Sequence, residues 1–195
     1  MKKIKTAILI SGRGSNMQSL IEACKNESFP AEISLVISNK ENAKGLEVAK
    51  NEGITTKFIN HKDFSSRVEF DRQVSKEIES HDCEIVCLAG FMRLLSGEFT
   101  KKWTGKAINI HPSLLPEFKG GNAVKDAFEA GVKKSGCTVH HLVEDMDAGE
   151  IIKQAEVDIL DGDSLDDVKA RILEQEHKIY PEALKMICVD LLKST

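Results

Sequence analysis

Short apolar runs rich in β-branched residues alternate with amphipathic segments along the first half of the chain. Each run has the length of a strand, and most are followed by residues with helical spacing. The runs predict strands at Thr6–Ile10, Ile33–Ser38, Thr56–Ile59, Glu84–Ala89 and Ala107–Ile110. The intervening segments predict helices at Asn16–Lys25, Ala43–Glu52 and Arg67–Ser80. This alternation is typical of a mostly parallel sheet with helices on both faces.

The pattern changes after residue 135, where longer runs alternate between apolar and polar positions. Thr138–Val143 and Ile151–Ile159 predict two further strands, which this alternation makes candidates for antiparallel pairing. A long helix is predicted from Leu165 to about residue 192, with Ser164 as its cap and Pro181 as a kink or break. The expected fold class is α/β, with a Rossmann-like, twisted, mostly parallel sheet whose C-terminal part is mixed.

Length and composition narrow the possible partners. The 195 residues suit a single domain, spanning 1–195, with enough chain to bury a substantial core. A net charge of −4 gives no basic footprint, so we expect no nucleic acid partner. No apolar segment reaches the length of a signal peptide or a membrane span, so we expect no membrane partner and a cytoplasmic location. The five scattered cysteines predict free thiols rather than disulfides or a zinc site.

Asn109 and His111 stand at the end of the fifth predicted strand. Alternate strand positions point the same way, so the two side chains should share a face. Pro112 cannot join the sheet ladder, which leaves the pair at the strand tip, where open α/β sheets bind ligands. An amide donor beside a titratable ring suits the oxygen of a carbonyl under attack. Side chains that merely satisfy loop backbone groups are the alternative.

The acidic turn Glu144–Gly149, between the two late strands, favours the catalytic interpretation. Asp147 from this turn, if brought to His111, would favour the charged imidazolium. A solvated turn in which Gly149 supplies an unusual backbone dihedral is the alternative. The adjacent His140 and His141 should point to opposite faces, so one is a candidate helper or a packed residue and the other should lie at the surface.

The first predicted strand leads into a glycine-containing turn, Ser11–Asn16, and then a helix. Glycines permit a tight turn, and free N–H groups at a helix start can hold a phosphate. Residue 17 is Met rather than a third glycine, and no acidic residue follows the second strand, so a phosphate without a dinucleotide is favoured. A plain turn capped by Ser15 is the alternative.

Three other features each allow two interpretations. The Leu88–Leu95 segment suits either a main-chain clamp for a flat heterocycle or a connection packed into the core. Glu176 falls on the apolar stripe of the long helix, so it either faces the sheet or lies at the stripe's wet edge. Arg67 opens the third predicted helix and suits either a ligand contact or the surface.

Five stretches together resemble the phosphoribosylglycinamide formyltransferase family, folate-dependent enzymes of purine biosynthesis. They span nearly the whole chain and follow the family's order. They are Ile10–Asn16, Leu88–Arg93, Asn109–Pro116, Asp145–Gly149 and Gln175–Pro181. The resemblance implies the formyltransferase fold and a one-carbon transferase of de novo purine (IMP) synthesis. The formyl group of 10-formyltetrahydrofolate, the co-substrate, would pass to the amine of N1-(5-phospho-D-ribosyl)glycinamide without a metal.

The resemblance also implies which residues act. Three would be catalytic: Asn109, His111 and Asp147. The ribonucleotide would contact Gly14, Ser15, Asn16, Leu173, Glu174, Gln175 and Glu176. The folate would contact Arg67, Met92, Arg93, Leu94, Leu95, Asn109, Val143, Glu144, Asp145, Met146 and Asp147. The segment 117–124 lacks histidines that some members carry, so its role in substrate contact is left open. A milder departure is Val143, which replaces a polar residue beside the acidic turn.

Two alternative functions stay open on the sequence: a 10-formyltetrahydrofolate hydrolase-like enzyme and a non-catalytic phosphate-binding module. Formylation of methionyl-tRNA is disfavoured by the acidic charge. Small-molecule substrates are the expected partners, and the chain would act as a monomer or a homodimer.

Overall fold

The computed structural model describes residues 2–194, and within them seven strands form one sheet. In chain order the strands are Ile4–Ile10 (β1), Ala31–Ser38 (β2), Thr55–Phe58 (β3), Ile85–Leu88 (β4), Ala107–His111 (β5), Lys134–His141 (β6) and Ile151–Asp158 (β7). Their order across the sheet is β3-β2-β1-β4-β5-β6-β7. Strands β1 to β5 pair in parallel, while β6 is antiparallel to both β5 and β7. The expected α/β class with a mixed C-terminal part is confirmed.

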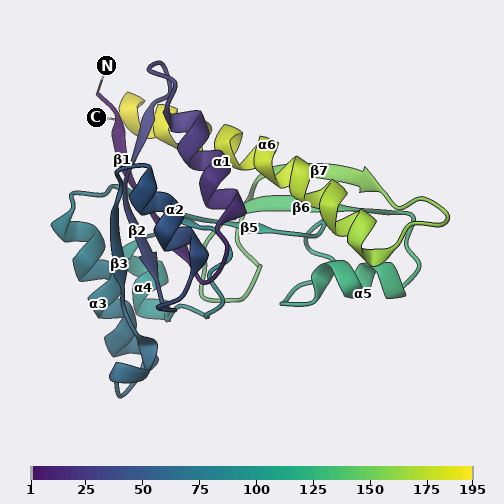
Figure 1. Cartoon of the computed structure of the whole chain (residues 1–195), viewed down its shortest axis with the longest axis horizontal. Helices are drawn as coiled ribbons and strands as arrows, with labels where there is room; N and C mark the ends of the chain where they lie inside the picture. The colour runs from purple at the N-terminus through teal and green to yellow at the C-terminus, as the bar shows by residue number, and fades with distance from the viewer. Residues whose placement is uncertain (1, 195) are drawn as a thin grey trace.

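Helices cover both faces of the sheet (Figure 1). They are Ser15–Cys24 (α1), Lys44–Asn51 (α2), Arg67–Ser80 (α3), Gly97–Lys102 (α4), Ala123–Glu129 (α5) and Leu165–Lys193 (α6), with a short 3-10 helix (η1) at His61–Asp63. Apolar residues of α1, α2 and α6 join one core cluster, and those of α3 and α4 join a second. The start of β1 and the end of α6 lie near the same corner of the molecule (Figure 1).

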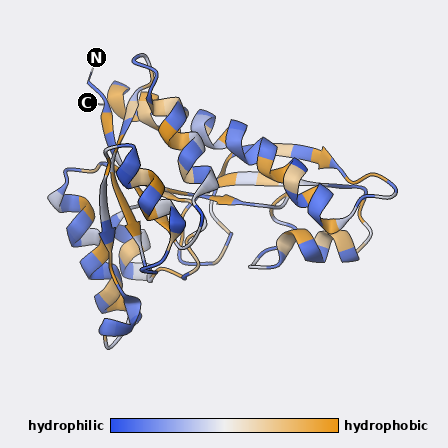
Figure 2. Ribbon diagram, in the orientation of Figure 1, coloured by the Kyte–Doolittle hydropathy of each residue, from blue (hydrophilic) through white to orange (hydrophobic). Residues whose placement is uncertain are grey.

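The central strand β1 is buried on both faces, which explains its continuous apolar sequence. Ile8 and Ile10 pack on the side of α1 and α6, whereas Ala7 and Leu9 pack on the side of α3. Figure 2 shows hydrophobic residues along the central strands, while the helices mix hydrophobic and hydrophilic positions. Burying each such isoleucine or leucine contributes about 1.5–3 kcal/mol, so this strand anchors the core.

The structure corrects the sequence-based prediction in three places. Strand β6 begins at Lys134 rather than Thr138, because its first residues pair with the end of β7 despite their polar character. Helix α6 continues through Pro181, so the prediction of a break there was wrong. The short helices α4 and α5 were not predicted, because segments of six and seven residues are too short to show a helical period.

Candidate active site

A cleft of about 450 Å³ opens at the carboxyl ends of β4 and β5. Its walls come from segments far apart in sequence: the loop after β4, the end of β5 and the loop after β6. Asn16 from α1 and Glu176 from α6 close one side. Open α/β sheets bind ligands at this edge, and the apolar lining with a few polar groups is typical of a small-molecule site.

His111 is the last residue of β5 and is 6% exposed. Its Nδ1 lies 3.5 Å from Oδ2 of Asp147, and its Nε2 lies 2.9 Å from the carbonyl oxygen of Phe118. Both ring nitrogens therefore face oxygen acceptors. Only the doubly protonated imidazolium can donate to both of them. The structure thus brings together the imidazole and the carboxylate that the sequence suggested as partners.

Asp147 is held on several sides within the loop between β6 and β7. Its Oδ2 accepts the N–H of Gly120 at 3.0 Å, and its Oδ1 lies 3.6 Å from Nε2 of His140. Its φ of 51° is in the left-handed region, which a non-glycine residue occupies at a cost of about 1–3 kcal/mol. Such backbone strain is found where the surrounding structure fixes a side chain for function.

Gly149 does not supply the unusual backbone dihedral that was considered for it in the acidic turn. The residue with positive φ in the acidic turn is Asp147, whereas Gly149 leaves room for a close backbone approach. A Cβ atom at position 149 would collide with the carbonyl group of His141. Gly149 therefore allows the loop to fold tightly against the end of β6.

Asn109 and His140 face each other across the β5–β6 pair, with Asn109 Nδ2 3.4 Å from His140 Nε2. His140 is 1% exposed, and its Nδ1 lies 2.9 Å from the carbonyl of His141. Burial lowers the pKa of His140, so its ring is neutral at neutral pH, with the proton on Nδ1. Its Nε2 then accepts from the Asn109 amide. His141 is partly buried rather than at the surface, which corrects the expectation for it.

The Ser11–Asn16 turn leaves the start of α1 open to a ligand. Gly14, with φ of 74°, is the N-cap, and Ser15 is the first helical residue, so Ser15 does not cap the helix. No side-chain cap bonds the first N–H groups, which are suited to an anion. Asn16 Nδ2 donates to Oε2 of Glu176 at 2.9 Å. Glu176 is 6% exposed, and burial raises its pKa, so it points inward and not to a wet edge.

Some residues expected at the site lie outside the cleft lining. Arg67 is exposed at the first turn of α3. On α6, Glu174 is exposed while Glu176 lines the cleft. Successive helical residues point about 100° apart, so the side chains of residues 173–176 cannot all face one ligand.

The segment 117–124 contributes more than the sequence indicated. Gly120 and Gly121 line the cleft, and the backbone at Phe118 and Gly120 contacts His111 and Asp147. These contacts use main-chain atoms, which leave no charge or periodic signal in a sequence. The adjacent glycines were the available sign, because glycine permits close approach of the backbone to a ligand.

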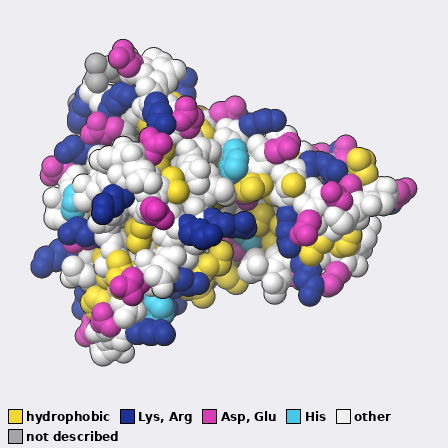
Figure 3. All heavy atoms as spheres, viewed as in Figure 1, with side chains coloured by type: hydrophobic (Ala, Val, Ile, Leu, Met, Phe, Trp, Pro, Cys, Tyr) yellow, Lys and Arg dark blue, Asp and Glu magenta, His cyan; other side chains and the backbone are white. Residues whose placement is uncertain are grey.

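Residues 2–194 show neither a cluster of metal ligands nor a helix that could cross a membrane. That range holds no group of three or more His, Cys, Asp or Glu residues arranged to bind a metal ion. No helix in it combines the length and apolar character needed to cross a membrane. Figure 3 shows positive and negative side chains interspersed over the face it draws, without a large patch of one sign.

Comparisons with known proteins agree with this geometry. Residues 4–184 match the formyl transferase family. A phosphoribosylglycinamide formyltransferase of Haemophilus influenzae is 44% identical over 185 residues, which are 95% of this chain and 86% of the relative. The solved phosphoribosylglycinamide formyltransferase of Brucella melitensis superposes with a TM-score of 0.91 at 44% identity, covering 96% of each chain.

The chain is also similar to part of a longer protein. It is 50% identical over 186 residues to the trifunctional purine biosynthetic protein adenosine-3 of Homo sapiens, which covers 95% of this chain. The chain spans 18% of the length of that relative. The match over residues 4–184, together with the bacterial relatives, shows that the chain belongs to the formyl transferase family.

Proposed function

We propose that this chain transfers the formyl group of 10-formyltetrahydrofolate to the amine of N1-(5-phospho-D-ribosyl)glycinamide, a step of purine biosynthesis. The observation that carries the proposal is the meeting of Asn109, His111 and Asp147 at the wall of one cleft. The names of the bacterial relatives support the choice of substrates. A hydrolase-like activity and a non-catalytic binding module are less well supported by these relatives.

The two substrates would enter the cleft from different sides. The phosphate of the ribonucleotide would sit on the N–H groups at Gly14–Asn16, and Glu176 would accept a hydroxyl of the same substrate. The folate would lie along residues 92–95 and 143–147, which line the cleft opposite Asn109. This arrangement places the amine of one substrate beside the formyl carbon of the other, which removes much of the entropic barrier.

The reaction requires stabilisation of charge on the formyl oxygen. The amine nitrogen forms a bond to the formyl carbon, and negative charge builds on the oxygen. The Asn109 amide and the protonated His111 would donate to that oxygen, and loss of one such donor costs ~100- to 1,000-fold in rate. Because Nε2 of His111 bonds to the Phe118 carbonyl in the structure, the formyl oxygen would replace that carbonyl.

Collapse of the intermediate then breaks the bond between the formyl carbon and the folate nitrogen. The proton lost by the attacking amine would pass through water to the leaving nitrogen, which gives tetrahydrofolate. Asp147 would keep His111 charged and correctly turned throughout. No step needs a redox change, since the formyl group is transferred at its own oxidation level.

The direct test incubates the chain with both substrates and follows the folate absorbance. We expect turnover that depends on the ribonucleotide, and a loss of about 100-fold or more in His111→Asn. His81→Asn, at the end of α3 and far from the cleft, serves as the matched control. Folate turnover without the ribonucleotide would point to a hydrolase, and no turnover with both substrates would point to a binding module.

We also infer a cytoplasmic location, since the five cysteines are free and a reducing compartment keeps thiols in that state. The small-molecule substrates need no protein partner, so either a monomer or a homodimer is compatible with the proposed activity.

A further inference from the structure

The side chain of Ser11 ties together the ends of three neighbouring strands. Ser11 follows β1, Asn39 follows β2, and the loop 89–96 follows β4. The Ser11 hydroxyl donates to Oδ1 of Asn39 at 2.6 Å and accepts the N–H of Met92 at 2.8 Å. The Ser11 N–H donates to the carbonyl of Gly90 at 3.1 Å. Ser11 and Asn39 are each 4% exposed, so the bond between their side chains is protected from water.

Ser11 is bonded to segments of both proposed substrate sites. It is the first residue of the turn that ends in Gly14–Asn16, the proposed phosphate contacts. The middle of this turn is fixed to α2, because the Gly12 carbonyl accepts the N–H of Gly45 at 3.0 Å. The bond from Met92 reaches the loop that lines the proposed folate site. A change in the position of the turn therefore acts on that loop through Ser11, by the main-chain bond to Gly90 and by the side-chain bond from Met92.

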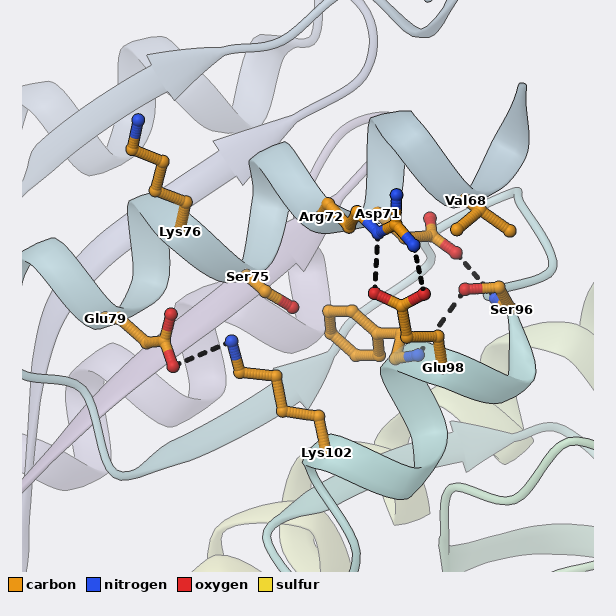
Figure 4. A pocket seen from close by; sticks show the side chains of 10 residues that line it. Val68, Asp71, Arg72, Ser75, Lys76, Glu79, Ser96, Glu98 and Lys102 are labelled. Carbon is orange, nitrogen blue, oxygen red and sulfur yellow. Dashed lines mark hydrogen bonds and ion pairs between the residues drawn. The ribbon is translucent and has the colours of Figure 1, made fainter.

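The far end of the same loop is held by a different residue. Asp71, on α3, accepts the N–H of Ser96 on Oδ2 at 2.6 Å, and both residues are 2% exposed. Figure 4 shows this contact beside a small pocket between α3 and α4. No hydrogen bond or ion pair described for Asp71 within residues 2–194 reaches the phosphate turn. Asp71 thus provides a comparison: it anchors the folate loop without a link to the other site.

We propose that Ser11 is a positioning residue that couples the two substrate sites, so that each ligand strengthens binding of the other. The proposal rests on the proposed function, because it needs the ribonucleotide on the turn and the folate on the loop. Coupling between two binding sites is reciprocal and typically amounts to about 5- to 150-fold in affinity. We expect the lower part of this range, since only two hydrogen bonds of Ser11 carry the link.

The experiment measures affinity for glycinamide ribonucleotide by calorimetry, with and without saturating tetrahydrofolate. Tetrahydrofolate carries no formyl group, so no reaction disturbs the measurement. In the unmodified chain, the folate should lower the dissociation constant of the ribonucleotide about fivefold or more. In Ser11→Ala the ratio of the two constants should fall toward one, because only the main-chain bond to Gly90 then joins the turn to the loop. In Asp71→Ala tetrahydrofolate should bind more weakly, while the ratio is retained at saturation.

Each other outcome has a separate meaning. If the unmodified chain binds both ligands with a ratio of one, the coupling is overturned and the proposed function stands. If it binds neither ligand, the proposed function itself fails. An unchanged ratio in Ser11→Ala, or a ratio of one in Asp71→Ala as well, overturns the assignment to Ser11. If Ser11→Ala does not fold, Ser11→Cys replaces the hydroxyl that accepts the Met92 N–H with a thiol, a weak acceptor, and an unchanged ratio there overturns the assignment.

Discussion

Two histidines lie beside the Asp147 carboxylate in the cleft, but their hydrogen-bond partners differ. His140 is enclosed within the sheet and donates to a backbone carbonyl, so its neutral form is favoured. His111 has oxygen acceptors at both ring nitrogens, an arrangement satisfied by the imidazolium. His140 can therefore orient Asn109 by accepting a hydrogen bond from its amide, while the proposed mechanism uses His111 as the donor. This division follows from partners within a few ångströms, which the sequence does not specify.

At the residue scale, the change Asp147→Asn tests the pairing with His111. The variant keeps the shape of the side chain but removes the charge that favours the imidazolium. We expect turnover to fall roughly 100-fold, within the range known for positioned acid–base groups, with little change in affinity for the ribonucleotide. Steady-state kinetics at neutral pH measures both quantities.

The matched control for that prediction is Asp190→Asn, an exposed carboxylate near the end of α6. It should leave turnover unchanged. If Asp147→Asn were as active as this control, Asp147 would not be the partner of His111.

At the scale of elements, α6 links the sheet and the cleft through its buried residues. The single O–H of Tyr180 is shared between the carbonyls of Leu88, the last residue of β4, and Ile108, near the start of β5, at 2.7 and 3.2 Å. Tyr180→Phe removes this donor from a fully buried position. We expect the free energy of unfolding to fall by about 1–3 kcal/mol in urea denaturation. Ser80→Ala removes an exposed hydroxyl and should change it by less than ~0.5 kcal/mol.

A second prediction concerns the contact between α1 and α6, where Glu176 accepts from Asn16. Burial raises the pKa of Glu176, so the folded state favours its neutral form. The resulting stability is present below the ordinary carboxyl pKa and lost as pH rises through the raised value. Glu176→Gln can keep the bond without ionising. As pH rises from 4 to 8, the melting temperature of the variant should therefore increase relative to that of the unmodified chain. Each kcal/mol of difference in the free energy of unfolding corresponds to about 2–4 °C.

Thermal melting at several pH values measures this difference. If the melting temperature of Glu176→Gln fell relative to that of the unmodified chain as pH rises, the raised pKa of Glu176 would be contradicted. Glu174→Gln removes an exposed carboxylate from the same helix and serves as the control for the loss of one negative charge.

The elements that could be predicted from the sequence are those whose buried residues recur with a regular spacing, or form a continuous apolar run, along the chain. Strand β1 and its neighbours were recognised because both faces are packed, and α3 because its apolar stripe is long enough. The contacts of Phe118 and Gly120 could not be predicted, because they use backbone atoms placed by a loop. The passage of α6 through Pro181 depends on tertiary packing, which overrides local propensity.

For the molecule as a whole, hydrogen exchange should report the gradient of burial across the sheet. The amides of β1 and β4 lie in its fully buried centre, so we expect them to exchange only through global unfolding. Strand β3 lies at an edge and is largely exposed, so its amides should exchange faster by local opening. Equal protection of β3 and β1, measured by mass spectrometry, would contradict this view of the fold.

The adjacency of the two chain ends has a consequence for how such a fold can be used. The amino end of β1 lies on the side of the sheet opposite the carboxyl ends of the strands, which form the cleft. Helix α6 ends near the amino end of β1 (Figure 1). Additional polypeptide attached at this corner would not cover the entrance for substrates. The geometry is thus compatible with a fold that serves as one segment of a longer, multifunctional polypeptide.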